Sequence, residues 1–350
     1  MNHLEVVGVI TLSSPCHQTS VEGADGNRTP TGKTLVVGED CQVREVPFVT
    51  GNSVRGRIHR IVAERVLTKI APVSRELAMC LCKGSAGSRG DLRAGEINPR
   101  TLAQAKDHAV VGLFGGGPYM LSSNLRIGNL YPLVEWTKPV VHPRNAHAVI
   151  PAEKLPRRLT VDLGFTARDD MAAGKLAPYV LNHDEEFVAW ISRVNASSQA
   201  KKAAKAEGKG SDVKKEDARF FGFYEAILPG LPLQLEVHLD HPTEAQAGIV
   251  LSALLDWANE NILGGGSARG LGTFKLTAAL IVDGKQLTDT LFMPAETGYR
   301  LSEAAGDLVR AGDLAIASMT ASDLLAFYPA GESAEDGKPQ RAAKNAAEVE

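Results

Sequence analysis

Residues 231–282 read LPLQLEVHLDHPTEAQAGIVLSALLDWANENILGGGSARGLGTFKLTAALIV. The first ten residues alternate between apolar and polar side chains, which predicts a half-buried β-strand. TEAQ at 243–246 is a capping box and begins an apolar helix that runs to about Leu263. The glycine-rich segment GGGSARGLGTF follows at 264–274, and TFKLTAALIV at 273–282 predicts another strand. The local order is therefore strand, helix, glycine-rich loop, strand.

This order excludes a dinucleotide-binding fingerprint, because there the glycines follow a strand and precede the helix. The position of the third glycine of that fingerprint is also occupied by Arg269. A helix C-cap explains only one glycine of this segment. A flexible turn between helix and strand remains an alternative when the segment is considered alone. Bare backbone N–H groups beside one guanidinium would suit a polyanion lying along the loop.

Upstream, alternating apolar residues predict a strand over 4–12, followed by a long polar loop over 13–45 in which TLVVG (34–38) predicts a strand. The loop contains GNRTPTGKT, but Asn27 stands where a phosphate-binding P-loop needs its first glycine, so that motif is excluded. Within residues 46–67, apolar side chains from Val54 to Val66 fall on one face and predict an amphipathic helix, whose start Thr50, Asn52 or Ser53 can cap. Arginines lie off its apolar face, at Arg55, Arg57, Arg60 and Arg65.

Composition bounds the remaining possibilities. The 350 residues, 44% of them hydrophobic, suit two small domains or one domain with large insertions. The formal net charge of −3 neither indicates nor excludes a nucleic-acid partner, so only local clusters of charge can indicate one. The four cysteines form no disulfide framework, and a zinc site from Cys16, His17, Cys41 and the Cys80/Cys82 pair would need an unfavourable C-x-C spacing. We therefore predict no metal.

No signal peptide or membrane-length apolar run is present, which predicts a cytoplasmic protein without membrane contact.

Several segments, taken together and in order, resemble the RAMP superfamily of RNA-binding proteins in CRISPR effector complexes. VPFVTGNSVRGRIHR (46–60) is similar to a helix start of that family, LFGGG (113–117) to its LFG segment, and GGGSARGLGTFKL (264–276) to its glycine-rich loop. VDLGFTARDDMAAGKLAPYV (161–180) and FFGFYEAILPGLPLQLEVHL (220–239) resemble the thumb hairpin and the palm strand after it. The details TGNSVRGRIHR and FGGGPYMLSSNLRIGNL are most similar to the backbone subunit of type IV effectors, the Csf group.

The resemblance implies an α+β fold, a modified ferredoxin-like (RRM-like) palm with a helical insertion and a protruding thumb. The palm is expected to comprise residues 1–56, 110–140 and 220–300, with the insertion at 57–109 and the thumb at 141–219. The lysine-rich segment 197–217 is expected to be a mobile thumb tip, because it contains few apolar residues. Residues 301–330 are expected to form a C-terminal helical segment and 331–350 a disordered tail.

The resemblance also implies a function in antiviral defence. Copies of the chain would stack into a helical filament along one crRNA, kink it with their thumbs and present its bases for target pairing. The implied partners are crRNA, a target nucleic acid expected to be DNA, further copies of the chain and other subunits of the complex, including a recruited helicase. No cofactor and no catalytic residue is expected.

Three groups of residues carry the expected RNA contacts. The helix start would hold phosphates through Asn52, Ser53, Arg55, Arg57 and Arg60. The LFGGG segment would lie beside the RNA with Gly115, Gly116, Gly117 and Tyr119, the tyrosine stacking on a base or packing in the core. The glycine-rich loop would follow the backbone with Gly265, Gly266, Ser267 and Arg269. On the thumb, Arg157, Arg158 and Arg168 are candidates for RNA or subunit contacts.

Two other functions stay open. Backbone subunits of type III effectors cut target RNA with a metal-dependent loop aspartate, and the corresponding loop here offers Asp25 and Asp40 without a clear match to the family pattern. Alternatively, the glycine-rich loop could line a pocket for a small ligand in a stand-alone protein. His59, His142 and His147 have no recognisable partner for acid–base catalysis, so we assign them none.

Overall fold

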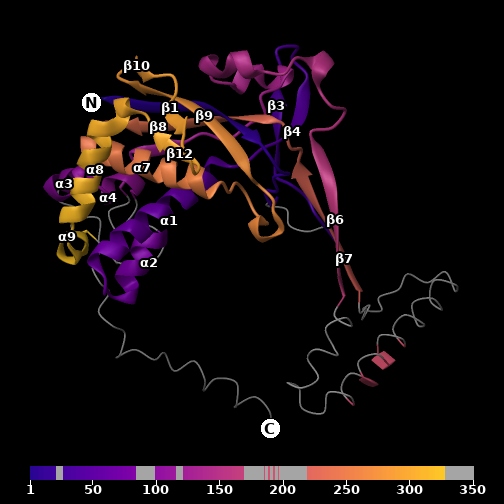
Figure 1. Ribbon diagram of the computed structural model, residues 1–350, viewed down its shortest axis with the longest axis horizontal. Coiled ribbons are helices and arrows are strands. Elements are labelled where there is room, and N and C mark those ends of the chain that lie inside the picture. Colours follow the sequence, from indigo (N-terminus) through magenta and orange to yellow (C-terminus); the bar gives the residue numbers. More distant parts are fainter. Residues whose placement is uncertain are drawn as a thin grey trace, which may run out of the picture.

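An antiparallel sheet of five strands forms the centre of the computed structural model (Figure 1). The structure describes residues 1–20, 27–83, 99–115, 121–168 and 219–327, with a few single positions between 185 and 196. The strand order is β10-β9-β1-β8-β5, and every neighbouring pair is antiparallel. These strands are β1 (His3–Leu12), β5 (Leu125–Ile127), β8 (Pro232–Asp240), β9 (Phe274–Val282) and β10 (Lys285–Thr288).

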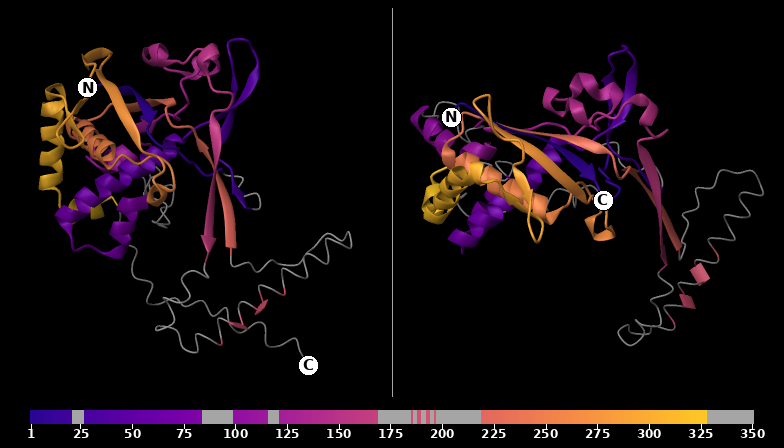
Figure 2. Two further views of the ribbon diagram at one scale, coloured as in Figure 1. Left: turned by 45° about the vertical axis from the view of Figure 1, so that its right-hand side comes forward. Right: turned by 45° about the horizontal axis from the view of Figure 1, so that its top comes forward.

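Two long helices, α1 (Gly51–Ile70) and α7 (Glu244–Glu260), contribute most of the apolar layer against one face of this sheet (Figures 1 and 2). Alternate side chains of β1, such as Leu4, Val6 and Ile10, join that layer and are fully buried. Along the chain the order is β1, α1, β5, β8, α7, β9. The predicted α+β class and the predicted strands at 4–12, 231–240 and 273–282 are confirmed.

The helix starts follow the predicted capping chemistry. Thr50 is the N-cap of α1 and its hydroxyl accepts from the Ser53 N–H, while Thr243 and Gln246 form the predicted capping box of α7. The end of α7 differs from the prediction. The helix stops at Glu260 because Asn261 adopts a left-handed conformation with φ of 56°, so the chain leaves the helix before Leu263.

Further helices pack beside α1 and α7 and enlarge the helical layer. They are α2 (Arg75–Lys83), α3 (Pro99–Asp107), α4 (Val111–Phe114), α8 (Gly306–Ser318) and α9 (Ala321–Leu325). The helices α7 and α8 approach closely at a pair of glycines, where a Cβ on Gly248 would lie 1.9 Å from the Leu308 carbonyl oxygen. Helix α1 is continuous across residue 56, where the sequence placed the boundary between palm and insertion.

A second sheet contains the hairpin of β6 (Thr160–Arg168) and β7 (Arg219–Ile227), which projects away from the central sheet (Figures 1 and 2). A short strand, β2 (Arg28–Thr29), adds to β7 in parallel. The segment 13–45 is more structured than predicted, because besides β2 it forms β3 (Lys33–Val37) and begins β4 (Val43–Pro47), a separate hairpin. The predicted thumb tip at 197–217 and the predicted tail at 331–350 lie outside the described residues.

Short elements complete the chain. They are η2 (Glu135–Val140), η3 (Pro143–Ala148), η4 (Ala152–Lys154), η6 (Ser267–Arg269), η7 (Glu303–Ala305), β11 (Phe292–Pro294) and β12 (Tyr299–Leu301). Among the helices that the structure describes, none combines the length and the apolar character needed to cross a membrane.

Candidate nucleic-acid interface

The start of α1 and the glycine-rich loop border one pocket of about 530 Å³. These two segments are about two hundred residues apart in the sequence, and the resemblance assigned both to RNA. The pocket is lined by residues from three parts of the chain, including Gln18, Thr19, Asn52, Ser53, Arg57, Arg60, Gly264, Gly265 and Ser267. We call it the α1–loop pocket. Of the predicted contacts, it brings together Asn52, Ser53, Arg57, Arg60, Gly265 and Ser267.

The electrostatics at the helix side of the pocket favour an anion. The N-terminus of α1 carries the positive end of the helix dipole, and its first turn contains no acidic residue. Within the described residues, Arg60 has no ion-pair or hydrogen-bond partner, and its guanidinium is free for a ligand. Arg57 is already paired, because its Nε donates to Glu260 Oε2 at 2.7 Å.

The glycine-rich loop owes part of its composition to its own turn. Gly264, Gly266, Gly270 and Gly272 all have positive φ between 75° and 82°, a conformation that favours glycine. A Cβ on Gly272 would lie 1.9 Å from the Leu263 carbonyl oxygen, whereas one on Gly270 would meet nothing within 4 Å. Gly265 differs, since its φ is not in this region and a Cβ there would lie 3.8 Å from the nearest atom.

Free backbone donors lie at the rim of the same loop. Among the groups that the structure describes, none accepts a hydrogen bond from the N–H of Ser267 or Ala268, at the start of η6. Ser267 lines the α1–loop pocket. Unpaired N–H groups beside a pocket with a free guanidinium make an environment that suits phosphate oxygens.

Arg269 lies on aromatic rings of the projecting hairpin. Its guanidinium carbon is 4.4 Å from the ring centre of Phe165 and 4.8 Å from that of Tyr224. These two rings stack on one another with their centres 4.9 Å apart. Arg269 therefore joins the glycine-rich loop to the base of the hairpin through cation–π contacts, an arrangement that its position in the sequence did not indicate.

Arg55 holds a carbonyl group of the protein. Its Nη2 donates to the Phe114 carbonyl oxygen at 2.6 Å, and its guanidinium lies over the Phe114 ring. It does not line the α1–loop pocket. Burial lowers the pKa of Arg55. These contacts fix the LFG segment to α1.

In the LFGGG segment, the structure describes Gly115, which ends α4 with φ of 61°. A Cβ there would lie 2.3 Å from the Leu121 carbonyl oxygen, so this glycine is required by the turn. The other predicted contacts of this segment, Gly116, Gly117 and Tyr119, lie outside the described residues.

His59 is buried beneath the helix start, 7% exposed, with its ring stacked on Phe114 at a centroid distance of 4.0 Å. Burial, assisted by the positive charges of Arg55 and Arg60, lowers its pKa from 6.5 to about 4. The folded protein therefore keeps this imidazole neutral over a pH range where the unfolded chain protonates it.

This difference predicts a stability change with pH. Between pH 6.5 and 4 the unfolded chain binds a proton at His59 that the folded chain does not, so stability falls as the pH falls. The expected loss by pH 4.5 is about 2 to 3 kcal/mol. Denaturant unfolding at pH 7 and pH 4.5 measures it, and His59→Phe should lose that part of the pH dependence. Equal pH dependence in the two proteins would contradict the prediction.

The thumb arginines Arg157 and Arg158 lie in a different pocket, of about 720 Å³, at the base of the projecting hairpin. The same pocket contains the Glu225 side chain, which is 4% exposed and accepts from Lys33 Nζ at 3.0 Å. Burial acts to raise the pKa of Glu225, but hydrogen bonds from Lys33 and Thr160 outweigh it and the net shift is downward. The third candidate, Arg168, is the last residue of β6.

Gln18 and Thr19 line the α1–loop pocket and were not predicted. The Gln18 side chain accepts from the Ser53 hydroxyl at 2.9 Å, which connects the segment after β1 to the start of α1. No local pattern indicated this role, because both residues lie in a polar segment that resembles an ordinary loop.

Of the two aspartates considered for RNA cleavage, Asp25 lies outside the described residues. Asp40 lies in the turn between β3 and β4, and both of its carboxylate oxygens accept from the Arg44 guanidinium. The Arg44 hydrogen bonds, with one from the Gln42 backbone, lower the pKa of Asp40 to about 2. The Asp40 carboxylate is therefore engaged by a neighbouring guanidinium of the same turn.

Comparison with known proteins finds similarity among solved structures. No family model matches the sequence, and no curated protein matches it. Among solved structures, the chain is similar to a chain described as "Type IV-B CRISPR Complex", with 17% sequence identity and a TM-score of 0.47. The match covers 79% of this chain and 90% of that one.

Proposed function

We propose that this protein is a non-catalytic, crRNA-binding backbone subunit of a type IV CRISPR effector complex, which polymerises along the guide and presents it for target pairing. The observation that carries the proposal is the α1–loop pocket. Two segments that resemble RNA-binding motifs of one family meet there, although they are far apart in the sequence. A chance similarity of either motif would not require the two to share a surface.

The chemistry of the pocket supports binding to the RNA backbone. Its donors are the free guanidinium of Arg60 and backbone N–H groups at the start of η6, and the dipole of α1 adds positive potential at the helix start. Such groups recognise phosphate and sugar, which are the same for every guide sequence. A subunit that must hold any spacer needs this kind of contact.

The order of the strands supports a ferredoxin-like palm. Without the outer strand β10, the sheet order is β9-β1-β8-β5, with α1 after β1 and α7 after β8. In chain order this is a βαββαβ unit with the first and third strands at the centre, the arrangement of ferredoxin-like domains. The projecting β6–β7 hairpin would be the thumb.

In the proposed filament, the thumb of one copy contacts the palm of the next. A head-to-tail contact generates an open filament when the rotation between copies does not close a ring, and we propose that arrangement here. The further proposed partners are the target nucleic acid, expected to be DNA, and other subunits of the complex with a recruited helicase. A thumb anchored to the RNA-binding loop through Arg269 would couple the filament contact to the bound guide.

Assembly with RNA tests the proposal. We expect the purified chain without RNA to be a monomer or a mixed oligomer, and added single-stranded RNA to produce a discrete ladder of larger species. Native mass spectrometry or size-exclusion chromatography with light scattering resolves the ladder. A stable closed dimer that is indifferent to RNA would contradict the proposal. A monomer that purifies free of nucleic acid and does not respond to RNA would favour a small-ligand protein.

A second function, metal-dependent cleavage of target RNA, has a separate test. The assembled complex is incubated with a matching labelled RNA and Mg²⁺. We expect the RNA to remain intact, because Asp40 pairs with Arg44 and neither Asp25 nor Asp40 clearly matches the catalytic pattern of the cleaving subunits. Cuts at a regular spacing that disappear in an Asp25→Asn variant would establish the cleaving function instead.

A further inference from the structure

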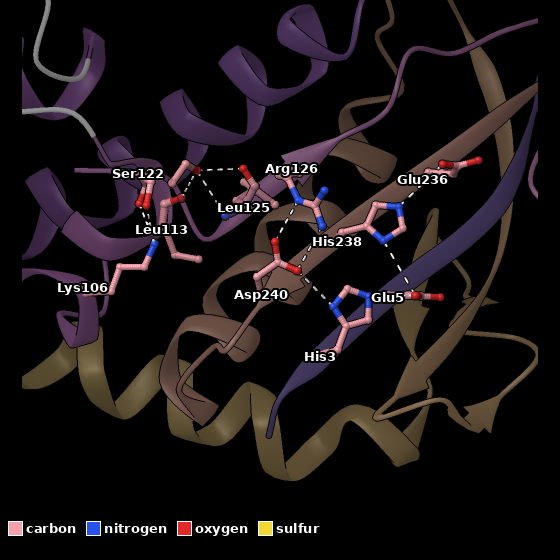
Figure 3. A network of polar contacts seen from close by, with 11 residues as sticks. His3, Glu5, Lys106, Leu113, Ser122, Leu125, Arg126, Glu236, His238 and Asp240 are labelled. Atoms are coloured by element: carbon pink, nitrogen blue, oxygen red, sulfur yellow. Dashed lines mark hydrogen bonds and ion pairs between the residues drawn. The ribbon is translucent and has the colours of Figure 1, made fainter. Parts of the chain in front are cut away.

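Two histidines and a carboxylate come together on the sheet face opposite α1 and α7 (Figure 3). His3 and Glu5 are at the beginning of β1, and His238 lies near the end of β8. The register pairs Glu5 directly with His238, and His3 with Asp240. The cluster is at the other end of β1 from the segment that lines the α1–loop pocket, about 30 Å of strand away.

The ligand atoms of the three side chains lie close enough together to converge on one ion. His3 Nε2 is 2.8 Å from Glu5 Oε1, and His238 Nδ1 is 3.9 Å from the same oxygen. One ligand atom from each residue can be chosen so that all lie within 4.8 Å of one another. Ligands of a tetrahedral zinc ion are about 3.3 Å apart, as metal–ligand distances of about 2.0 to 2.1 Å require. Small side-chain rotations would close the cluster around an ion.

A second layer of carboxylates faces the far side of each imidazole. The His3 Nδ1 atom is 3.2 Å from Asp240 Oδ1, and the His238 Nε2 atom is 3.6 Å from Glu236 Oε2. Histidines that bind metals characteristically donate their other N–H to a carboxylate, which fixes the ring and makes the ligating nitrogen more basic. Asp240 is close enough to accept from His3, and Glu236 would have to move slightly closer to accept from His238.

Carboxylates of Glu5, Asp240 and Glu236 surround the two imidazoles. Arg126 on β5 compensates Asp240, with Nε 2.9 Å from Oδ2. Within the described part of the chain, the charge partners of Glu5 and Glu236 are the two imidazoles alone. A cation bound at the imidazoles would lie beside carboxylates that have no arginine or lysine partner in that part of the chain.

We propose that His3, Glu5 and His238 bind a divalent transition-metal ion of the Zn²⁺ class. Two imidazoles and one carboxylate form a ligand set that zinc accepts, and three protein ligands leave a fourth position for water or another group. Nitrogen ligands favour such an ion over Mg²⁺ or Ca²⁺, which prefer oxygen. The site is independent of the proposed RNA function.

The ion would clip the beginning of β1 to the end of β8. At present this end of β1 is held by Asp283, whose Oδ1 accepts from the backbone N–H groups of Asn2 and His3 at 2.8 Å. A metal bridge between the two central strands stabilises the folded state in proportion to its occupancy, because the unfolded chain does not bring the ligands together.

The experiment uses the full chain, stripped with a chelator and dialysed. Isothermal titration calorimetry with ZnCl₂ should give about one equivalent of saturable binding, accompanied by a rise in the melting temperature. His238→Gln removes a ligand and should abolish this binding. Glu236→Gln removes only an outer carboxylate and should weaken it by about 10 to 100-fold. His147→Gln, an exposed histidine on η3, is the matched control and should bind as the wild type does.

Cobalt distinguishes this site from one that uses cysteine. Co²⁺ added to the stripped chain should produce visible ligand-field bands without the near-ultraviolet thiolate band that exposed Cys41 would give. Circular dichroism checks that each variant is folded, and Glu5→Gln, which keeps the side-chain shape, provides a second ligand variant if His238→Gln unfolds. The proposal is overturned if the wild type shows no saturable binding, if ligand variants bind as tightly as the wild type, or if the thiolate band appears.

Discussion

The double variant Arg57→Ala/Arg60→Ala should bind unrelated single-stranded RNAs about 100-fold more weakly than the wild type, and by a similar factor for each sequence. Both arginines line the α1–loop pocket, and a hydrogen bond to a charged group contributes about 1.5 to 3 kcal/mol. Removing Arg57 also leaves Glu260 without its partner beside the pocket, which adds a repulsive charge. The slope of log affinity against log salt should flatten by about 0.7 for each lost phosphate contact.

Fluorescence anisotropy with two or three RNAs of different sequence, over a range of salt concentrations, measures both quantities. Arg65→Ala is the matched control, because Arg65 lies on the same helix but its Nε donates to Asp256 at 2.7 Å and it borders another pocket. We expect this control to leave the affinity within about twofold and the slope unchanged. A loss confined to one RNA sequence would indicate base readout, and an unchanged slope would make these arginines an ordinary solvated face.

Arg55 illustrates where reasoning from the sequence stopped. Its place in a basic helix start assigned it to RNA together with Arg57 and Arg60. The structure uses it to hold the Phe114 carbonyl oxygen, 59 residues further along the chain. An alanine at position 55 would therefore disturb the LFG segment, and a loss of RNA binding in that variant would not identify a contact. Arg55 bonds the protein and Arg60 faces the pocket because their tertiary neighbours differ, and helix periodicity cannot predict those neighbours.

The elements that were predicted correctly have local causes. A capping box begins α7, alternation defines β1, β8 and β9, and Thr50, one of three candidates, caps α1. What the sequence did not predict depends on long-range pairing. Gln18 and Thr19 border the pocket because the chain after β1 passes the start of α1, where Gln18 bonds Ser53. The His3–Glu5–His238 cluster forms because β1 and β8 are neighbouring strands in a register that pairs Glu5 with His238.

A series of single alanine substitutions in the glycine-rich loop should separate the glycines that the turn requires from the one that borders the pocket. Gly272→Ala should cost about 3 kcal/mol of folding stability, because φ is 82° and the new Cβ would lie 1.9 Å from a backbone oxygen. Gly270→Ala has a similar φ of 75° in open space, so only the backbone strain of about 1 kcal/mol remains. Denaturant unfolding measures both.

Gly265→Ala completes the series and decides between the two explanations of the loop. Its backbone is not left-handed and the nearest atom to a new Cβ would be 3.8 Å away, so stability should change by less than about 1 kcal/mol. Because Gly265 lines the α1–loop pocket, the added methyl group should nevertheless weaken RNA binding. If the loop were only a turn between α7 and β9, RNA affinity would follow stability, and Gly272→Ala would be the most damaging variant of the three. An RNA defect in the stable Gly265→Ala protein would therefore indicate that RNA passes close to this backbone.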